Sequence, residues 1–231
     1  MRQAQLDLAI RKLDRATAPF PLWLVDASRP PAAGAGTLLS REERARAGRF
    51  RDPWLRDRYI TAHCALRLVL EHCFAIPAVR QSFGLGAFGK PYLEGVPQAQ
   101  FSLSYSGHII LIGAAADVAI GVDIERLRPV HGAADLARSL GSPVELAALE
   151  RCVAGSARFD RMFLEIWTRK EACVKAAGVG IAETDLAAIE SGAGSGLKTV
   201  RVGFRQLRTD TTLIDNVFIA AWAAGNVPVS Y

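Results

Sequence analysis

The chain has 231 residues, of which 50% are hydrophobic and 22% are charged. This composition is typical of a globular protein with one large domain or two small ones, and it excludes a disordered or low-complexity chain. The longest apolar run, 109–116, is too short to cross a bilayer, and residues 1–15 lack the apolar core of a signal peptide. The four cysteines form no C-x-x-C pair, which predicts reduced thiols. We therefore expect a soluble, cytoplasmic protein without a membrane partner.

The chain carries a formal net charge of +5, which favours acidic partners. Charge alone does not distinguish among nucleic acid, phosphorylated cofactors and acidic proteins. A solvated helix face is the simpler interpretation of the basic residues. They concentrate in an arginine-rich segment that contains Arg41, Arg44, Arg46, Arg49, Arg51, Arg56, Arg58 and Arg67.

The first half of the chain predicts a strand, two helices and then further strands. Residues 20–27 predict the first strand. Ser40, with Glu43 three residues later, forms a capping-box pattern that begins a short helix. Apolar residues spaced by three or four predict a long helix over 54–74. A turn at 88–92 precedes the predicted strands, which are 101–106, 109–116 and 119–124.

The second half predicts two helices followed by two strands. Ser142-Pro143-Val144-Glu145 combines an N-cap, a proline at the first helical position and a glutamate at the third. A longer helix is predicted over 159–177, and Gly178 ends it. The strands are predicted over 199–207 and 213–224.

The two halves of the chain resemble each other weakly. The apolar segments 109–116 and 217–224 both follow a long predicted helix and a glycine-bearing turn, and both end in alanines. Similar strands also arise by chance, so the alternative is that no duplication occurred. A duplication predicts an α+β fold with two similar α/β subdomains, 1–117 and 118–231. The cleft between such subdomains is the usual place for a ligand.

Asp123 and Glu125 alternate around one apolar residue, so on a strand both carboxylates point to the same side. A solvated pair on an exposed face is the ordinary interpretation of this spacing. The preceding residues 119–122 are apolar, however, and indicate that the carboxylates emerge from a core strand. Carboxylates in that position repel each other unless a cation neutralises them, and Mg²⁺ typically takes one or two protein carboxylates plus phosphate oxygens.

Trp167, Glu171 and Lys175 recur every four residues, so the predicted helix places them on one stripe. An ordinary Glu-to-Lys helix pair beside a partly buried tryptophan is the alternative. If this stripe faces Asp123 and Glu125, three acids and a lysine converge. Such a cluster suggests a site for a hard cation and a phosphorylated substrate.

Two further segments carry groups suited to phosphate. Lys90 lies between a glycine and a proline, which restricts the lysine to an extended backbone and allows a ligand to approach closely. Exposed turn lysines are common, which is the alternative explanation. Ser102, Ser104 and Ser106 alternate on one face, where they either bind a phosphate or edge a strand.

Together these segments resemble the 4′-phosphopantetheinyl transferases, in particular the longer, single-chain, surfactin-synthetase-type branch. The resemblance runs from about residue 40 to residue 180, in the family's order. The segments that carry it are the arginine-rich helix leading to Arg58, Phe88-Gly89-Lys90-Pro91, 101–106, Gly121-Val122-Asp123-Ile124-Glu125 and 167–175. The last two are the most specific.

The resemblance implies an enzyme that moves the phosphopantetheine arm of coenzyme A to a serine of an apo acyl, polyketide or peptidyl carrier protein. It implies a pseudo-twofold arrangement of two similar subdomains with coenzyme A in the cleft between them. It also implies dependence on Mg²⁺, release of adenosine 3′,5′-bisphosphate, a monomer and no nucleic-acid partner. The implied Mg²⁺ ligands are Asp123, Glu125 and Glu171. The implied catalytic residues are Glu171, Lys175 and Asp123. The implied contacts to coenzyme A come from Arg46, Arg58, Lys90, Ser104, Tyr105 and Lys175.

One residue departs from the family pattern. The family often has histidine at the position of Tyr105, and tyrosine keeps a hydrogen-bond donor but carries no positive charge at neutral pH. Two other functions stay open at this point. One is a non-catalytic module that binds phosphorylated ligands or nucleic acid through the arginine-rich segment, and the other is an inactive partner of a carrier-protein enzyme.

Overall fold

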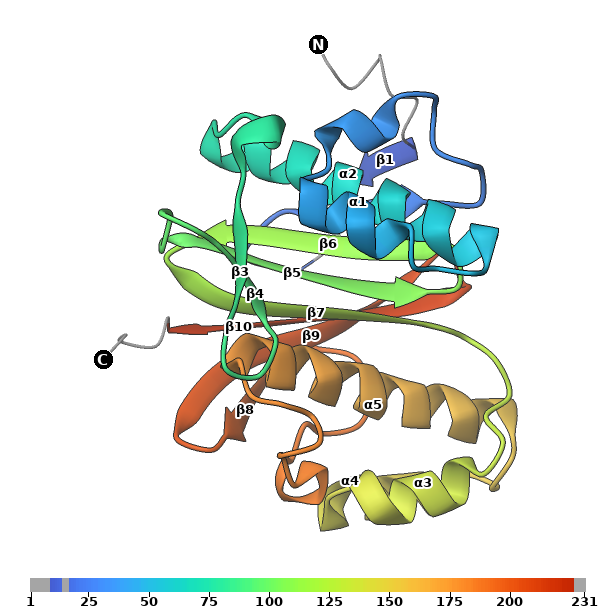
Figure 1. The fold of residues 1–231 in the computed structure, drawn as a ribbon. Helices are drawn as coiled ribbons and strands as arrows, with labels where there is room; N and C mark the ends of the chain where they lie inside the picture. Colours follow the sequence, from blue (N-terminus) through green and yellow to red (C-terminus); the bar gives the residue numbers. More distant parts are fainter. Residues whose placement is uncertain (1–8, 14–16, 227–231) are drawn as a thin grey trace.

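The computed structural model describes residues 9–13 and 17–226. Two four-stranded antiparallel sheets stack on each other in the described part of the chain (Figure 1). The first sheet has the order β1-β2-β6-β5 and the second has the order β7-β10-β9-β8. The strands of the first sheet are β1 (Ala9–Lys12), β2 (Leu22–Asp26), β5 (Ala99–Ser106) and β6 (Ile109–Ala116). Those of the second are β7 (Val118–Arg126), β8 (Lys198–Val202), β9 (Arg205–Ile214) and β10 (Phe218–Asn226).

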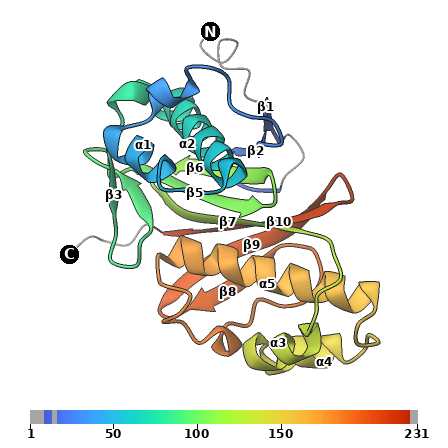
Figure 2. The ribbon, with the colours of Figure 1, turned by 45° about the vertical axis from the view of Figure 1, so that its right-hand side comes forward.

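The helices cover the two outer faces of this stack, which gives four layers (Figures 1 and 2). The long helix α2 packs on the first sheet and α5 packs on the second. The inner faces of the two sheets meet in an apolar layer that includes Leu111, Val122 and Trp222. The helices are α1 (Arg41–Ala47), α2 (Pro53–Phe74), α3 (Ala133–Leu140), α4 (Pro143–Leu149) and α5 (Ala157–Ala177). A separate hairpin consists of β3 (Phe83–Leu85) and β4 (Pro91–Leu93).

The two halves share one topology. In the first half the chain passes through β2, α2, β5 and β6, and the last strand lies between the other two. In the second half it passes through β7, α5, β9 and β10, and again the last strand lies between the others. The two segments that resemble each other in sequence form most of these central strands. The α+β fold class is therefore confirmed, and the order of strands supports a duplication. The subdomain boundary between 117 and 118 stays a prediction.

The helix ends follow the sequence signals closely. Ser40 Oγ accepts from the backbone N–H of Glu43, and a Glu43 carboxylate oxygen accepts from the backbone N–H of Ser40. Ser142 and Glu145 form the same reciprocal pair at the start of α4. Gly178 ends α5 in the left-handed region, with φ of 68°. These predicted helix ends are confirmed because local side chains supply the hydrogen bonds that a helix terminus lacks.

The prediction of two strands over 199–207 and 213–224 is wrong, because three strands occupy this part of the chain. A tight turn at Gly203, with φ of 58°, separates β8 from β9. A second turn at Asp215 and Asn216 separates β9 from β10, and both residues have positive φ, at 50° and 56°. Asp and Asn tolerate this conformation better than other non-glycine residues. Strand-forming residues continue on both sides of each turn and concealed the breaks.

Other features of the described residues agree with the sequence. All four cysteines are free thiols, and Cys64 and Cys173 are buried. In the portion of the chain that the structure describes, no helix is both long and apolar enough to cross a membrane.

A buried ion pair joins the two helices of the first half. The Glu43 carboxylate lies 2.6 Å from the Arg67 guanidinium and 3.0 Å from His63 Nδ1. Burial raises the pKa of Glu43, but hydrogen bonds from His63, the Ser40 backbone N–H and Arg67 outweigh it and leave the pKa at about 2. This carboxylate therefore stabilises the folded state only while it is ionised.

The Glu43→Gln substitution tests this contribution. A pKa depressed from 4.5 to about 2 corresponds to roughly 3 kcal/mol of stability, present above about pH 4.5 and lost as the pH falls towards 2. We expect the variant to have a lower Tm than the parent at neutral pH, and the difference to shrink steadily below pH 4.5. Thermal unfolding across this pH range measures the effect. Glu94→Gln, at an exposed position outside the helices, is the matched control, and a pH-independent difference for Glu43→Gln would contradict the assignment.

Candidate active site at the contact between the two sheets

The edge strands β5 and β7 lie side by side where the two sheets meet, and we call this contact the seam. Serine side chains link the two strands. Ser102 Oγ accepts from the backbone N–H of Val122 at 3.1 Å, and Ser106 Oγ accepts from that of Arg126 at 2.8 Å. Ser104 Oγ donates to Asp123 at 2.6 Å. All three serines are buried, so their alternation serves to join the strands at the seam.

The predicted acids and lysine converge at this seam. Asp123, on β7, is only 4% exposed. Lys175, on α5, places its ammonium 2.7 Å from Asp123 Oδ1 and 3.2 Å from Ser104 Oγ. The same ammonium lies 3.7 Å from the carboxylate of Glu171, one helical turn earlier. Two segments about fifty residues apart therefore bring their charges to one place.

The carboxylates at the seam influence one another. Burial raises the pKa of Asp123, and Lys175 and Ser104 oppose that increase. Burial also raises the pKa values of Glu125 and Glu171, and the charge of Asp123 raises both further. Lys175 and, beside Glu125, Arg128 oppose these increases, but three acids in a desolvated space still outnumber the two cations. Such a set of oxygen donors fits a hard divalent cation, which coordinates carboxylates and phosphate oxygens.

The acids are close together but do not enclose a common point. Among the residues that the structure describes, no three His, Cys, Asp or Glu side chains are arranged to hold a metal ion. The Lys175 ammonium instead contacts Asp123 and lies near Glu171. The donor chemistry of the predicted metal site is therefore present, whereas its ligand geometry is not assembled.

Gly121 explains how α5 comes so close to β7. A Cβ atom at this position would lie 2.0 Å from the backbone oxygen of Ala172 and 2.4 Å from the backbone nitrogen of Ala176. Only glycine leaves space for this approach of helix and strand. The glycine at the start of the Gly121–Glu125 motif therefore sets the spacing between Asp123 and the helix that carries Lys175.

Two arginines lie on the other side of β5, packed against aromatic rings. The Arg58 guanidinium lies 4.6 Å from the centre of the Trp54 ring and 5.3 Å from that of Tyr105, and it donates to the Gly107 carbonyl at 2.9 Å. The Arg46 guanidinium lies 5.6 Å from the Tyr59 ring. Burial and the nearby Tyr59 raise the pKa of Tyr105, so this phenol is neutral. The predicted residues Arg46, Arg58 and Tyr105 are thus brought together beside the seam.

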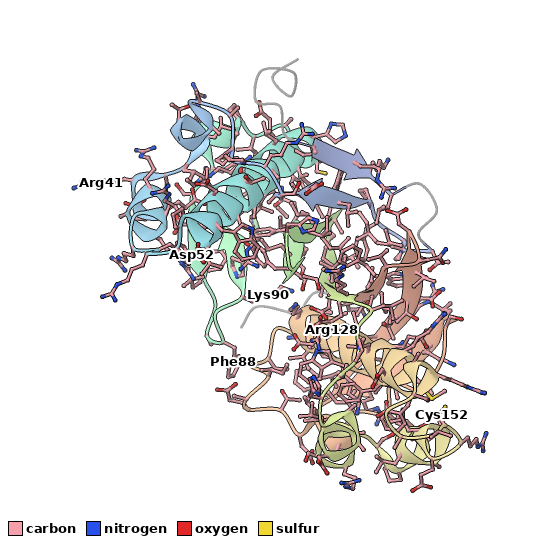
Figure 3. The ribbon with its side chains drawn as sticks, turned by 90° about the vertical axis from the view of Figure 1, so that its right-hand side faces the viewer. Arg41, Asp52, Phe88, Lys90, Arg128 and Cys152 are labelled. Carbon is pink, nitrogen blue, oxygen red and sulfur yellow. The ribbon has the colours of Figure 1, made fainter. Side chains whose placement is uncertain are left out.

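Trp54 and Tyr59 are contacts that the sequence analysis missed. Trp54 precedes Arg58 by four residues on α2, and this spacing could have indicated an aromatic–arginine pair. The other arginines of this segment differ in their environments. Arg67 is 1% exposed and donates to the carbonyls of Ala78 and Gln81, which makes it structural. Arg41 projects away from the body of the molecule (Figure 3).

Lys90 lies at the other end of the seam and faces inward (Figure 3). Its ammonium donates to the carbonyl of Ile120 at 2.9 Å, and burial together with the charge of Arg205 lowers its pKa to about 8. Both cations line a cavity of about 210 Å³ between the β3–β4 hairpin and the end of α5. The structure therefore separates Lys90 from the acids, and Arg205 is a neighbour that the sequence did not reveal.

Comparisons with known proteins agree with this arrangement. The signature of the 4′-phosphopantetheinyl transferase superfamily matches residues 119–223. A Synechocystis sp. protein named provisionally as a 4′-phosphopantetheinyl transferase is 35% identical over 69% of this chain and 65% of its own length. The 4′-phosphopantetheinyl transferase HetI of Nostoc sp. is 32% identical over 71% of this chain and 70% of its own. The 4′-phosphopantetheinyl transferase Sfp of Bacillus subtilis is 25% identical over 63% and 62%.

An α+β fold whose two halves share one topology, with acids and a lysine at the seam, defines the class of protein together with these similarities. The chain belongs to the 4′-phosphopantetheinyl transferase superfamily. The matched part of the chain spans about two thirds of the length of the relatives named above. The predicted family is therefore confirmed.

Gly121→Ala tests the close approach of α5 to the seam. The added methyl group meets the helix backbone, which cannot move aside as a flexible side chain does, so we expect a displaced α5 and a fall in Tm of several degrees. Thermal unfolding and a crystal structure of the variant measure both effects. Gly36→Ala is the matched control, because a Cβ there meets nothing within 4 Å. A Gly121→Ala variant with an unchanged Tm and helix position would contradict this role.

Proposed function

We propose that this protein transfers the 4′-phosphopantetheine arm of coenzyme A to a serine of an apo carrier protein. The observation that carries the proposal is the convergence of Asp123, Glu171 and Lys175 at one buried seam, in a chain that belongs to this family. In the reaction, the serine oxygen forms a bond to the β-phosphorus of coenzyme A. The bond from that phosphorus to the bridging oxygen breaks, and adenosine 3′,5′-bisphosphate leaves.

The carboxylates of Asp123, Glu125 and Glu171 are the groups proposed to hold Mg²⁺. When bound, Mg²⁺ supplies positive charge to the pyrophosphate oxygens and to the acids that burial has deprived of solvent. For the three acids to hold one ion, Lys175 would have to leave its contact with Asp123. The flexible lysine side chain can make this change without movement of the helix backbone.

Two residues of the chain are proposed to act directly in the transfer. Lys175, once released from Asp123, stabilises the charge that gathers on the leaving phosphate. Glu171 accepts the proton of the carrier serine, directly or through one water molecule, because burial and Asp123 raise the pKa of this carboxylate. A carboxylate fully committed to a metal is a weak base, so these two roles of Glu171 compete.

The aromatic-bound arginines provide a second anion site on the same enzyme. Arg46 and Arg58 each present a guanidinium group, which binds phosphate well through charge-assisted hydrogen bonds. The aromatic rings beside these arginines, from Trp54, Tyr59 and Tyr105, restrict the arginine rotamers before a ligand arrives. This restriction lowers the entropy lost on binding. We propose that they bind the 3′-phosphate of coenzyme A, with Tyr105 as a neutral donor in place of the usual histidine.

The expected partners follow from this reaction. They are coenzyme A and an apo acyl, polyketide or peptidyl carrier protein, bound by a monomer in the cytoplasm. The acids of the seam argue against nucleic acid as its ligand, because carboxylates repel a polyanion in the absence of metal. A test with coenzyme A, Mg²⁺ and one carrier of each class, followed by mass spectrometry of the carrier, examines the proposal. A carrier that gains a phosphopantetheine mass supports it, and no change with any carrier refutes it.

Glu171→Gln separates catalysis from binding. The amide keeps the size of the side chain but neither accepts the serine proton nor offers a charged ligand, so we expect kcat to fall about 100- to 10,000-fold. Coenzyme A should still bind in the absence of metal, as measured by isothermal titration calorimetry. Near-normal turnover would remove Glu171 from the mechanism. Glu150→Gln, at an exposed position beyond the seam, serves as the control.

Arg58→Met tests the second anion site. Loss of one charge-assisted hydrogen bond to phosphate typically weakens binding by 1.5–3 kcal/mol, so we expect KM for coenzyme A to rise about 10- to 100-fold with little change in kcat. Dephospho-coenzyme A, which lacks the 3′-phosphate, should be used equally well by the variant and the parent. The control is Arg56→Met, whose guanidinium lies 3.5 Å from Asp57 at the surface. Equal losses with both donors would show that Arg58 does not bind the 3′-phosphate.

A further inference from the structure

Two cations immediately before Glu171 are buried, although lysine and arginine usually keep their charged ends in water. Arg169 is 0% exposed and Lys170 is 1% exposed. Neither faces the seam, because consecutive helical residues project about 100° apart and Glu171 takes that direction. These two residues therefore belong to the Trp167–Lys175 motif without belonging to the candidate site.

Lys170 has all its donor capacity satisfied inside the protein. Its ammonium lies 2.6 Å from Glu145 Oε2 and donates to the carbonyls of Leu140 and Leu186, each at 2.7 Å. An ammonium group has three donors, and here each has a partner. The lysine thereby connects α5 with the end of α3, with the start of α4 and with the turn at 186–188.

Both carboxylate oxygens of Glu145, the partner of Lys170, also have hydrogen-bond partners. Glu145 is 0% exposed, and its Oε2 also accepts from the backbone N–H of Ser142 at 2.9 Å. Its Oε1 accepts from the backbone N–H of Ser191 at 2.8 Å, from the Ser191 hydroxyl at 2.7 Å and from Gly192 N–H at 3.1 Å. A carboxylate with this many partners cannot turn without breaking several hydrogen bonds.

Arg169 holds the same loop from another direction. Its Nη1 donates to the carbonyls of Ser191 and Gly192, at 3.1 and 2.5 Å. Its Nη2 donates to the carbonyl of Gly194 at 2.6 Å and to the Thr211 hydroxyl on β9 at 3.1 Å. Arg169, Lys170 and Glu145 thus form one network, which we call the buried cation network.

Apolar packing alone would fix the rotation of α5 poorly at this level of the helix. The face that meets the second sheet consists largely of small residues, among them Ala172, Ala176 and Ala177, and it lies against Gly121. Small, smooth surfaces resist rotation and sliding less than interlocking large side chains do. Directional hydrogen bonds from two adjacent residues, 100° apart, constrain both movements.

We infer that the buried cation network is a positioning device for Glu171 and Lys175, an inference that rests on the proposed function. A side chain extends roughly 5–6 Å from the helix axis, so a rotation of about 10° moves its end by about 1 Å. A displacement of that size in a reacting group can reduce the rate about 100-fold. Arg169 and Lys170 therefore act through the helix, and neither touches the substrates.

The structure of the network suggests why charges are used here. A buried ion pair is weak evidence of stability, because well-packed apolar residues of similar size often serve as well or better. Charged groups with fixed hydrogen-bond directions specify one arrangement of the helix, which apolar residues do not. The network is thus required for the rate of transfer more than for folding.

The double variant Glu145→Gln/Lys170→Met tests this inference, because it removes both charges at nearly constant volume. We expect it to fold, as judged by circular dichroism and a cooperative thermal transition, and to bind coenzyme A within threefold of the parent in the absence of metal. We expect kcat to fall about 30- to 100-fold and the gain in coenzyme A affinity on adding Mg²⁺ to disappear. The single variant Lys170→Arg, which retains the charge beside Glu145, should have a higher kcat than the double variant.

The matched control is Arg161→Met, which removes the exposed partner of the buried Glu165 on the same helix and should change kcat less than twofold. Parental kcat and parental Mg²⁺ linkage in the double variant would overturn the inference. So would a loss of metal-free coenzyme A binding as large as the loss of kcat, since that indicates general disruption. If the parent protein itself modifies no carrier, the proposed function fails instead, and the Mg²⁺-linked binding of coenzyme A still tests the position of Glu171.

Discussion

Removing carboxylates from water at the contact between two sheets costs free energy unless positive charge replaces the lost solvent. Asp123 is in this position, and Glu125 and Glu171 share its surroundings. Lys175 supplies one compensating charge at 2.7 Å. The remaining deficit is what makes this seam suited to a cation and an anionic cofactor. The rest of the fold serves to hold these groups at a fixed separation.

Several unrelated contacts hold that separation. The serines of β5 tie the first sheet to β7, and Gly121 lets α5 approach the same strand. On the far side of α5, Arg169 and Lys170 bind loops instead of substrates. Each device lies within a segment already singled out by the family resemblance. The motifs therefore contain both the residues proposed to bind ligands and the residues that hold the strands and the helix around them.

The sequence predicted local structure well where the cause is local. Ser40 with Glu43 and Ser142 with Glu145 carry their own hydrogen-bond partners, so the starts of α1 and α4 could be predicted. The turn at Asp215 and Asn216 was missed because strand-forming residues surround it. The approach of Asp123 to Lys175 came from the family motif, since no local rule relates residues 52 positions apart. The burial of Lys170 contradicts the usual preference of lysine, and only the position of Glu145 explains it.

The shared topology of the two halves has a further consequence. A pseudo-twofold relation that superposes β2 on β7 and β5 on β9 would turn the β5–β7 seam into a β9–β2 contact. Within residues 9–13 and 17–226, no serine links and no acid–lysine cluster join those two strands. Two identical halves would create two equivalent seams, whereas this chain builds only one. In the described part of the chain, one of the two strand contacts that the shared topology relates therefore carries the acids and the lysine, so the proposed reaction would use one donor molecule for each chain.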